Sequence, residues 1–265
     1  MKKFVRAFSL YALVPLLLAG FCVGYVWRDS RQHENDKALL AAVKASDTPA
    51  ALAALKNGAN PNARDIPDDS RTLKERLFDL FHPNRQRSSK FGFRIEEYRT
   101  ALFLSVLLEF NNTAVIKALL DYGADPNAKI LYPDSSSDSA GNPLVFAEMQ
   151  RNGYVAHLLV EHHADIHVLS QDDQSPLMIA AGNNNCAEVE WLLQHGANIE
   201  EENSGGQRAL SYAIDYDADT TAQYLVEHGA DVNHKDKEGY TALYYARKSH
   251  NPIFRKLLIK ARAVE

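Results

Sequence analysis

Gly196-Ala197-Asn198-Ile199-Glu200 and Gly229-Ala230-Asp231-Val232-Asn233 are two copies of the segment that decides the fold of this chain. The segment, here called the tail, has the form Gly-Ala-Asp/Asn, any residue, then Asn, and replacements are found in some copies. The last three tails are 33 residues apart. A fixed period of this length indicates a chain built from repeated structural units. The other copies are Gly58-Ala59-Asn60-Pro61-Asn62, Gly123-Ala124-Asp125-Pro126-Asn127 and His163-Ala164-Asp165-Ile166-His167.

A second segment, here called the opening, recurs 21 residues before each of the last three tails. Ser, Thr or Asn at its first position can accept a hydrogen bond from a free backbone N–H at the start of a helix. Pro at the second position has the backbone angle that the first helical turn requires. We therefore expect each opening to begin a helix. The openings are Thr100-Ala101-Leu102-Phe103, Asn142-Pro143-Leu144-Val145, Ser175-Pro176-Leu177-Met178, Arg208-Ala209-Leu210-Ser211 and Thr241-Ala242-Leu243-Tyr244.

Each repeated unit has room for a second helix between its opening and its tail. Apolar pairs mark this helix, for example Val115-Ile116 with Leu119-Leu120, and Gly at the start of the tail is suited to end it. Asn184 and Asp217 fall between the two helices of their units, where a left-handed residue is often needed. The pattern predicts one pair of helices per unit.

The openings resemble the Thr-Pro-Leu-His that begins an ankyrin repeat, and the 33-residue period is that of ankyrin repeats. This resemblance covers residues 34–265 and implies an all-α ankyrin-repeat solenoid of about six helix pairs with β-hairpin fingers. We expect the first pair at Asp36–Ala45 and Thr48–Lys56, and the last within Thr241–Ala263, both acting as caps. Ankyrin repeats bind other proteins, so the resemblance implies a non-enzymatic module that binds a partner protein through its fingers and concave surface.

Two insertions interrupt the array, at about residues 66–95 and 130–141, and insertions in such arrays fall on one face, often the binding face. The first combines a basic loop with a short amphipathic helix, which favours an acidic partner or an anionic membrane. Alternatively, its apolar side chains dock on the concave side and its arginines are solvated or pair with the acidic second insertion. The candidate partner-binding residues are Arg85, Arg87, Lys90, Arg94, Leu77, Phe81, Asp172, Asp173, Lys235 and Lys237.

The N-terminus contains 21 residues without a charge, 7–27, which as a helix would span roughly 31 Å, the thickness of a bilayer core. We predict a transmembrane signal-anchor there, with residues 1–6 as a cytoplasmic tail and 28–33 as a linker. The ankyrin domain would then be extracytoplasmic, and periplasmic in a bacterium. The alternative is a cleaved signal peptide and a secreted protein.

Composition and motifs argue against several other functions. The net charge of −5 does not favour nucleic acid as a partner. We find no phosphate-binding loop, nucleophile motif or metal-ligand spacing, and therefore expect no cofactor and no catalytic activity. We expect a monomer that binds an unidentified protein, similar to exported bacterial immunity or partner-protecting proteins. The alternative is an envelope scaffold held on anionic lipid by the anchor and the basic finger.

Overall fold

The computed structural model describes residues 31–64, 100–107, 113–128, 142–170, 172–249 and 251–263. Within these ranges the helices form six consecutive pairs, as the sequence predicts. The first pair consists of residues 31–44 and α2 (Thr48–Lys56). The others are α4 (Ala101–Leu107) with α5 (Thr113–Asp121), α6 (Pro143–Met149) with α7 (Gly153–Glu161), α8 (Pro176–Gly182) with α9 (Cys186–Gln194), α10 (Ala209–Asp215) with α11 (Asp219–Glu227), and α12 (Ala242–Lys248) with α13 (Pro252–Lys260).

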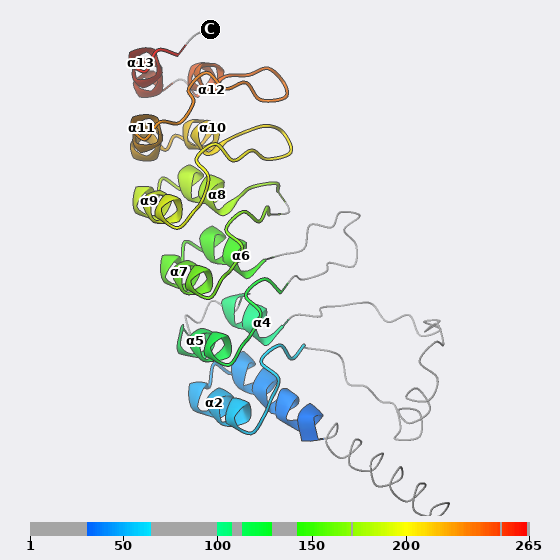
Figure 1. Ribbon diagram of the computed structural model, residues 1–265. Coiled ribbons are helices and arrows are strands. Elements are labelled where there is room, and N and C mark those ends of the chain that lie inside the picture. Colours follow the sequence, from blue (N-terminus) through cyan, green and yellow to red (C-terminus); the bar gives the residue numbers. More distant parts are fainter. Residues whose placement is uncertain are drawn as a thin grey trace, which may run out of the picture.

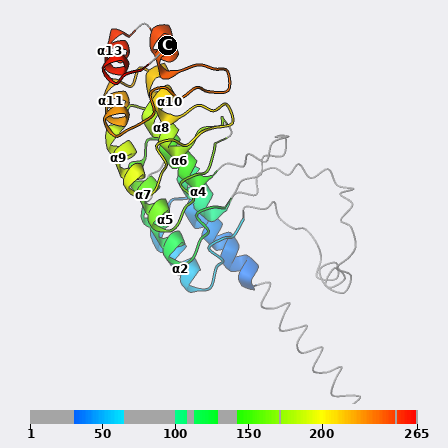
Figure 2. The same ribbon diagram turned by 45° about the horizontal axis from the view of Figure 1, so that its top comes forward.

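The pairs stack into an elongated solenoid with two rows of helices (Figure 1). The first helix of each pair lies in the inner row and the second in the outer row, with residues 31–44 at one end and α13 at the other. The loops between successive pairs, here called fingers, project from the inner row to the same side (Figures 1 and 2). The fingers and the inner row therefore share one continuous face of the solenoid.

The openings begin the inner helices as expected, with a side-chain cap at three of them. Asn142 Oδ1 accepts from the backbone N–H of Leu144 at 2.8 Å, and Ser175 Oγ from that of Met178 at 3.3 Å. Thr100 Oγ1 accepts from the N–H of Phe103 at 3.2 Å. Arg208 and Thr241 precede α10 and α12 without a side-chain hydrogen bond to the helix. At those two positions the helix is held by packing of its apolar residues instead.

Left-handed residues separate the helices, as the sequence predicts. Asn184 and Asp217 both have φ of 56° between the helices of their pairs. At four tails a glycine in the left-handed region ends the outer helix, with φ between 89° and 105°. The third tail has His163 there instead, with φ of 70°, and this conformation is unfavourable for a residue with a Cβ.

The tail motif has a structural explanation in two sets of hydrogen bonds. The third residue of each tail accepts from the backbone N–H of the fifth, as Asp125 Oδ1 does from Asn127 at 2.9 Å. The last Asn then bridges to the next tail: Asn62 Oδ1 accepts from the N–H of Asp125 at 2.6 Å, and Asn62 Nδ2 donates to the carbonyl of Gly123 at 3.2 Å. Asn127 makes the same two bonds to the third tail. These asparagines join successive repeats.

The fingers are not β-hairpins in the described ranges, which corrects the expectation. These ranges contain no strand and only two isolated antiparallel bridges, Arg64 with Thr100 and Lys235 with Thr241. At the finger that contains Asn203, the backbone N–H of Asn203 donates to the carbonyl of Gln207 at 3.0 Å. The N–H of Gln207 donates to Asn203 Oδ1 at 2.8 Å, so a side chain takes the place of the second backbone acceptor. A ladder of paired backbone bonds, which a hairpin requires, does not form.

The first helix also differs from expectation, because residues 31–33, predicted as part of a linker, are already helical. The described residues do not include the predicted cytoplasmic segment 1–6, the anchor 7–27 or the two insertions, at about 66–95 and 130–141. Among the helices that the structure describes, none is both long and apolar enough to cross a bilayer.

The buried apolar side chains form two clusters rather than one continuous core. The first extends from Leu39 to Ala164 and the second from Ile166 to Leu258, and the half-buried Val160 packs against both. The division falls between the third and fourth repeats, a boundary that we call the joint. Two acidic side chains are buried there, Glu148 of α6 and Glu188 of α9, which are 3% and 5% exposed.

Candidate partner-binding site

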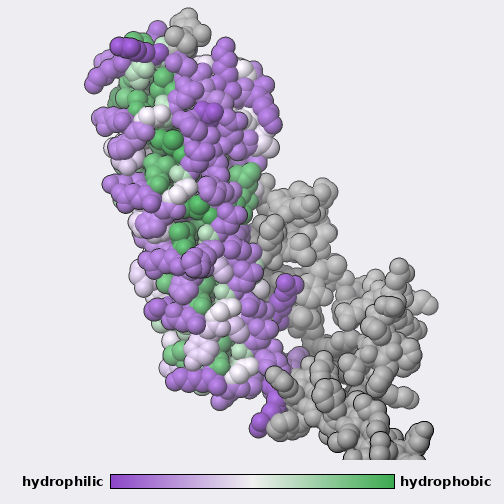
Figure 3. All heavy atoms as spheres, in the orientation of Figure 1, coloured by the Kyte–Doolittle hydropathy of each residue, from purple (hydrophilic) through white to green (hydrophobic). Residues whose placement is uncertain are grey.

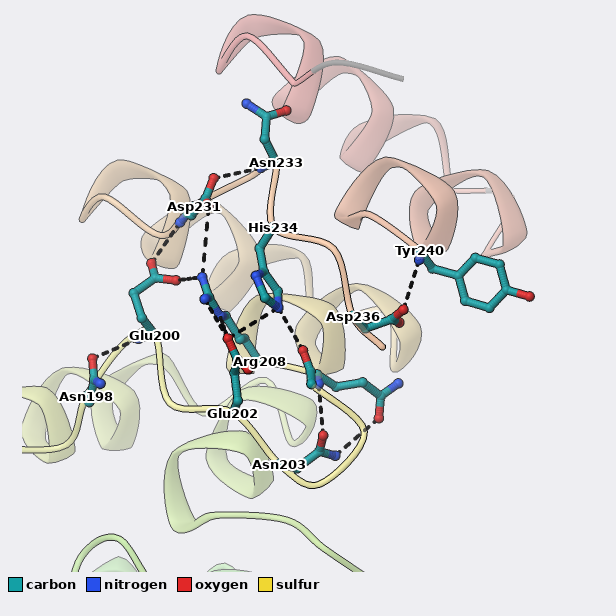
Figure 4. Close-up of polar contacts among 12 residues, drawn as sticks. Asn198, Glu200, Glu202, Asn203, Arg208, Asp231, Asn233, His234, Asp236 and Tyr240 are labelled. Carbon is teal, nitrogen blue, oxygen red and sulfur yellow. Dashed lines mark hydrogen bonds and ion pairs between the residues drawn. The ribbon is translucent and has the colours of Figure 1, made fainter. Parts of the chain in front are cut away.

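The last two fingers, which contain Glu202 and His234, are cross-linked by a network of charged side chains centred on Arg208 (Figure 4). Arg208 Nη2 lies 2.7 Å from Glu202 Oε1, and Nη1 contacts the carboxylate of Glu200 and lies 3.9 Å from Asp231 Oδ2. The hydrogen bond from Arg208 holds the pKa of the Glu202 carboxyl below its usual range. One guanidinium therefore connects three carboxylates on two successive repeats.

Backbone and histidine contacts complete the connection between these two fingers. Glu200 Oε1 accepts from the backbone N–H of Asp231 at 2.8 Å, where the earlier repeats use an asparagine. His234 Nε2 donates to the carbonyl oxygen of Gly206 at 2.8 Å and lies 3.5 Å from Glu202 Oε1. Figure 4 shows that these side chains converge between the two loops.

The tips of the fingers also contact each other. The backbone N–H of Lys237 donates to the carbonyl of Gly205 at 3.0 Å, next to Gly206 with φ of 76°. A Cβ at Gly206 would lie 3.0 Å from the nitrogen of Lys237, so this contact requires glycine. On the preceding finger, Asp173 Oδ2 accepts from the backbone N–H of Ser204 at 2.7 Å and from its hydroxyl. The three fingers are held in one arrangement.

Four of the ten candidate residues lie in these fingers, and the other six lie outside the described residues. Asp173 and Lys237 both hold neighbouring fingers together, Asp173 through its carboxylate and Lys237 through its backbone. Asp172 and Lys235 are exposed on the same fingers. The structure thus brings these four residues to one face of the solenoid, although two of them support the fingers directly.

The inner row presents exposed apolar side chains on the same face, which the sequence analysis missed. Met149 of α6 is 51% exposed, Tyr216 at the end of α10 is 59% exposed, and Tyr244 of α12 is 41% exposed. The ring of Tyr244 stacks on Tyr240 of the adjacent finger at 3.9 Å. Tyr216 packs beside Gly182, where a Cβ would lie 3.4 Å from its ring. The signal was available: Met149 and Tyr216 lie at or next to the end of an inner helix, and Tyr244 lies in an opening, and both regions recur along the array.

A second set of residues was also missed, and its signal is likewise periodic. Ser170, Asn203 and Asp236 are 33 residues apart, each five positions before an opening, and each is less than 9% exposed. All three accept a backbone hydrogen bond that closes their finger. Asp236 also accepts a hydrogen bond from the hydroxyl of Tyr245 at 2.7 Å. The pKa of Tyr245 is raised mainly by burial and, to a smaller extent, by this hydrogen bond.

A shallow hollow of about 10 Å³ lies between the fingers that contain Glu202 and His234 and the inner row. Glu200, Arg208, Asp231 and His234 line its polar side, and Leu210 belongs to its apolar side. Its volume lies below the range of small-molecule sites. Arg208, Glu200, Asp231 and His234 on its polar side are engaged in the bonds that hold the fingers.

The histidines have structural contacts. The rings of His157 and His195 both stack on the indole of Trp191, with ring centroids 3.8 and 3.7 Å apart. His195 Nδ1 donates to the carbonyl of Trp191 at 2.8 Å, and His228 repeats this contact with Tyr224. In the part of the chain that the structure describes, no three histidine, cysteine or acidic side chains are grouped so that they could hold a metal ion.

Comparison with known proteins agrees with this geometry. Residues 144–236 match a family model described as ankyrin repeats (3 copies), and residues 97–130 match the model of a single ankyrin repeat. The chain is an ankyrin-repeat protein. The residues matched include α6 to α11 and therefore two of the three fingers that contact one another.

A solved structure supports the same fold. An ankyrin repeat domain from Acinetobacter baumannii AYE is 24% identical, with a TM-score of 0.65 over 85% of this chain and 98% of that one. At this identity the likeness establishes the architecture alone. No curated protein matches the sequence. Ankyrin repeats are typically non-enzymatic interaction scaffolds, and neither family model indicates a catalytic family.

Proposed function

We propose that the ankyrin solenoid binds a partner protein on the face formed by the last three fingers and the inner helix row. The observation that carries this proposal is the row of exposed Met149, Tyr216 and Tyr244 beside fingers that are fixed by their own contacts. Tyrosine and methionine are enriched at protein interfaces. A partner would cover these side chains without displacing the network around Arg208.

The fixed conformation of the fingers favours binding. Association costs free energy for every loop and side chain that it immobilises. Here the fingers are already fixed by contacts of Arg208, Asp173 and the backbone of Lys237. The last finger is also closed by the hydrogen bond from the N–H of Tyr240 to Asp236. The face is thus preorganised, and the exposed tyrosines have few torsions to lose.

We extend the proposal to the N-terminus, where the charge-free residues 7–27 would tether the solenoid to a membrane with the repeats on the extracytoplasmic side. In this arrangement the protein serves as an immunity or partner-protecting protein, and the basic insertion 66–95 adds a second contact for an acidic partner. An envelope scaffold attached to lipid is the alternative, and in that case no protein would require the tyrosine face.

The test is affinity capture with the full chain, followed by titration of the protein recovered. Replacing both Tyr216 and Tyr244 by alanine should weaken binding by more than about 30-fold, the effect of losing an interface hot spot. Tyr154 is the matched control, because it is 61% exposed but lies on the outer helix α7. Equal loss of binding in Tyr154→Ala, or none in the double variant, would contradict the proposed face.

A further inference from the structure

The last repeat differs in charge from the three before it. Residues 142–240 contain seventeen acidic and four basic side chains, a net charge of −13. Residues 241–263 contain six basic and no acidic side chains. The solenoid is therefore strongly polarised along its axis, with the positive charge concentrated on the helix pair at its carboxyl-terminal end.

Four of these cations lie on or just after α13, on the side that no other helix among the described residues covers (Figure 1). Phe254 and Leu258 are fully buried and face the solenoid. The opposite face contains the exposed Arg255, Lys256 and Lys260, and Arg262 follows directly after the helix. None of these four side chains forms an ion pair with another residue that the structure describes, whereas Lys248 of α12 lies 3.4 Å from a carboxylate oxygen of Asp215.

Two isoleucines are exposed among these cations. Ile253 and Ile259 are 53% and 58% exposed. Successive residues of a helix are rotated by 100°, which places Ile259 one turn after Arg255 and Lys256 and between them around the helix. By the same rotation Ile253 lies next to Lys256 and Lys260. Apolar and hydrophilic side chains are accordingly mixed at this end of the surface (Figure 3). A terminal cap normally presents a polar outer face, so exposed isoleucines here need a reason.

We propose that this face, Ile253, Arg255, Lys256, Ile259, Lys260 and Arg262, docks on an anionic lipid bilayer. Charge complementarity is the main argument, since four unpaired cations match a surface of a single sign. A convex terminal helix fits a plane, and its aliphatic side chains can enter the region below the headgroups. A protein partner fits less well, because lysine is depleted at protein interfaces and this face has no exposed aromatic residue.

The acidic middle of the solenoid determines how the contact is made. Its net charge of −13 would repel an anionic membrane along the sides of the array. Charges beyond about 8 Å are largely screened at physiological ionic strength, so α13 would dock end-on on a bilayer that faces this end of the solenoid, not on the one that residues 7–27 would enter at the opposite end. The docking face is independent of the proposed tyrosine face, which lies on the inner row and would stay open to a partner.

The experiment is lysine footprinting of the full chain held in nanodiscs of neutral lipid, to which vesicles are added. Acetylation rates of Lys256 and Lys260 are compared between vesicles of neutral phosphatidylcholine and vesicles containing phosphatidylglycerol. Lys235 and Lys237 on the fingers are internal controls. Docking predicts that Lys256 and Lys260 react at least about fivefold more slowly in the anionic vesicles, with recovery at high salt and no change at the control lysines. The neutral nanodisc keeps any insertion of residues 7–27 the same in both measurements.

Variants distinguish docking from a general effect of the lipid. Ile253→Ser with Ile259→Ser keeps every charge and should reduce the protection. Arg255→Gln with Arg262→Gln should lower the affinity for anionic vesicles by about fivefold per cation and so abolish the protection at the same lipid concentration. Equal acetylation rates in the two vesicle types would overturn the proposal. Protection that survives both pairs of substitutions would also overturn it, and protection gained only on adding an acidic protein would assign the face to a protein instead.

Discussion

The first three repeats and the last three are joined internally by different contacts, and neither kind is found at the joint between them. In the first half, Asn62 and Asn127 bridge successive tails. In the second half, Glu200 and the network around Arg208 take this role between the fourth and fifth tails, and Asn233 Nδ2 donates to the carbonyl of Arg262 in the last repeat at 3.5 Å. At the joint the corresponding residue is His167, whose Nδ1 lies 3.0 Å from Glu201 Oε1, and no bond to the next tail is made among the described residues.

The interior changes at the same boundary. The apolar core divides there, and Glu148 stands at the position that Ala181 and Ile214 occupy in the next two repeats. Burial, followed by the charge and hydrogen bonding of Glu188, raises the pKa of Glu148 to about 9. Glu188 in turn lies 3.1 Å from His157 Nε2. The comparison indicates that the solenoid consists of two units, and that the second contains the fingers and the two tyrosines of the proposed binding face, while Met149 belongs to the first.

The largest expected effect comes from opening a cavity in one unit only. Leu192→Ala in α9 removes a side chain with no exposed surface and should destabilise the second unit by about 2–5 kcal/mol. Urea unfolding followed by the fluorescence of Trp191, in a Trp27→Phe background, reports on this unit. Leu119→Ala in α5 is the matched control, and should leave the Trp191 transition nearly in place. An equal shift with both variants would mean that the array unfolds as one unit.

The second effect is a dependence of stability on pH. Because the folded state raises the pKa of Glu148 from 4.5 to about 9, it holds a proton that the unfolded chain releases in this range. The free energy of unfolding should therefore fall as pH rises from 4.5 to 9, by at most about 3 kcal/mol up to pH 7. Glu148→Gln should remove this component, whereas Glu190→Gln on the exposed side of α9 should not. An identical pH profile in wild type and Glu148→Gln contradicts the assignment.

A smaller gain should follow from restoring the missing bridge. His167→Asn places the amide of the other tails at the joint and should add about 1 kcal/mol of stability while bringing the two unfolding transitions closer. The reciprocal change, Asn127→His, should lower the stability of the first unit by a similar amount. Calorimetry of the two variants measures both shifts, and no gain in His167→Asn would show that another feature weakens the joint.

The smallest effect concerns the backbone at the third tail. His163 has φ of 70° where the other tails have glycine, so His163→Gly should relieve a left-handed conformation. The greater freedom of glycine in the unfolded chain offsets part of the gain, which leaves about 0.5–1 kcal/mol. Gly196→Ala, at φ of 105°, should destabilise the next repeat in the same thermal unfolding experiment. A loss of stability in His163→Gly would contradict this reason.

The sequence predicted the helix pairs because their signals are local. Proline and a capping side chain at Asn142 and Ser175, and glycine at the tails, act within a few residues and repeat every 33 positions. The sequence did not predict how the fingers close. The same residues are compatible with a β-hairpin, and the hydrogen bond from the N–H of Gln207 to the side chain of Asn203 takes the place of a hairpin backbone bond. The joint was missed because contacts such as that of His157 with Glu188 join different repeats and follow no period.

The proposed site was predicted only in part for the same reason. Charge marked Asp173 and Lys237 as finger residues, but their role in holding neighbouring fingers depends on the distance between successive repeats. The exposed tyrosines were not distinguished from partly buried ones, since Tyr216 and the half-buried Tyr212 stack on the same side of the inner row and differ in the contact of the Tyr212 hydroxyl with Asn203 of the finger.

The most direct test of the central claim, that the second unit binds a partner through its inner row, is site-specific photo-crosslinking. A photoreactive phenylalanine analogue replaces Tyr216 on the finger side or Tyr154 on the outer row, two residues of nearly equal exposure, 59% and 61%. The account predicts a crosslinked partner at position 216 and none at position 154 in the full chain. Crosslinking at position 154 alone, or equally at both positions, would contradict it.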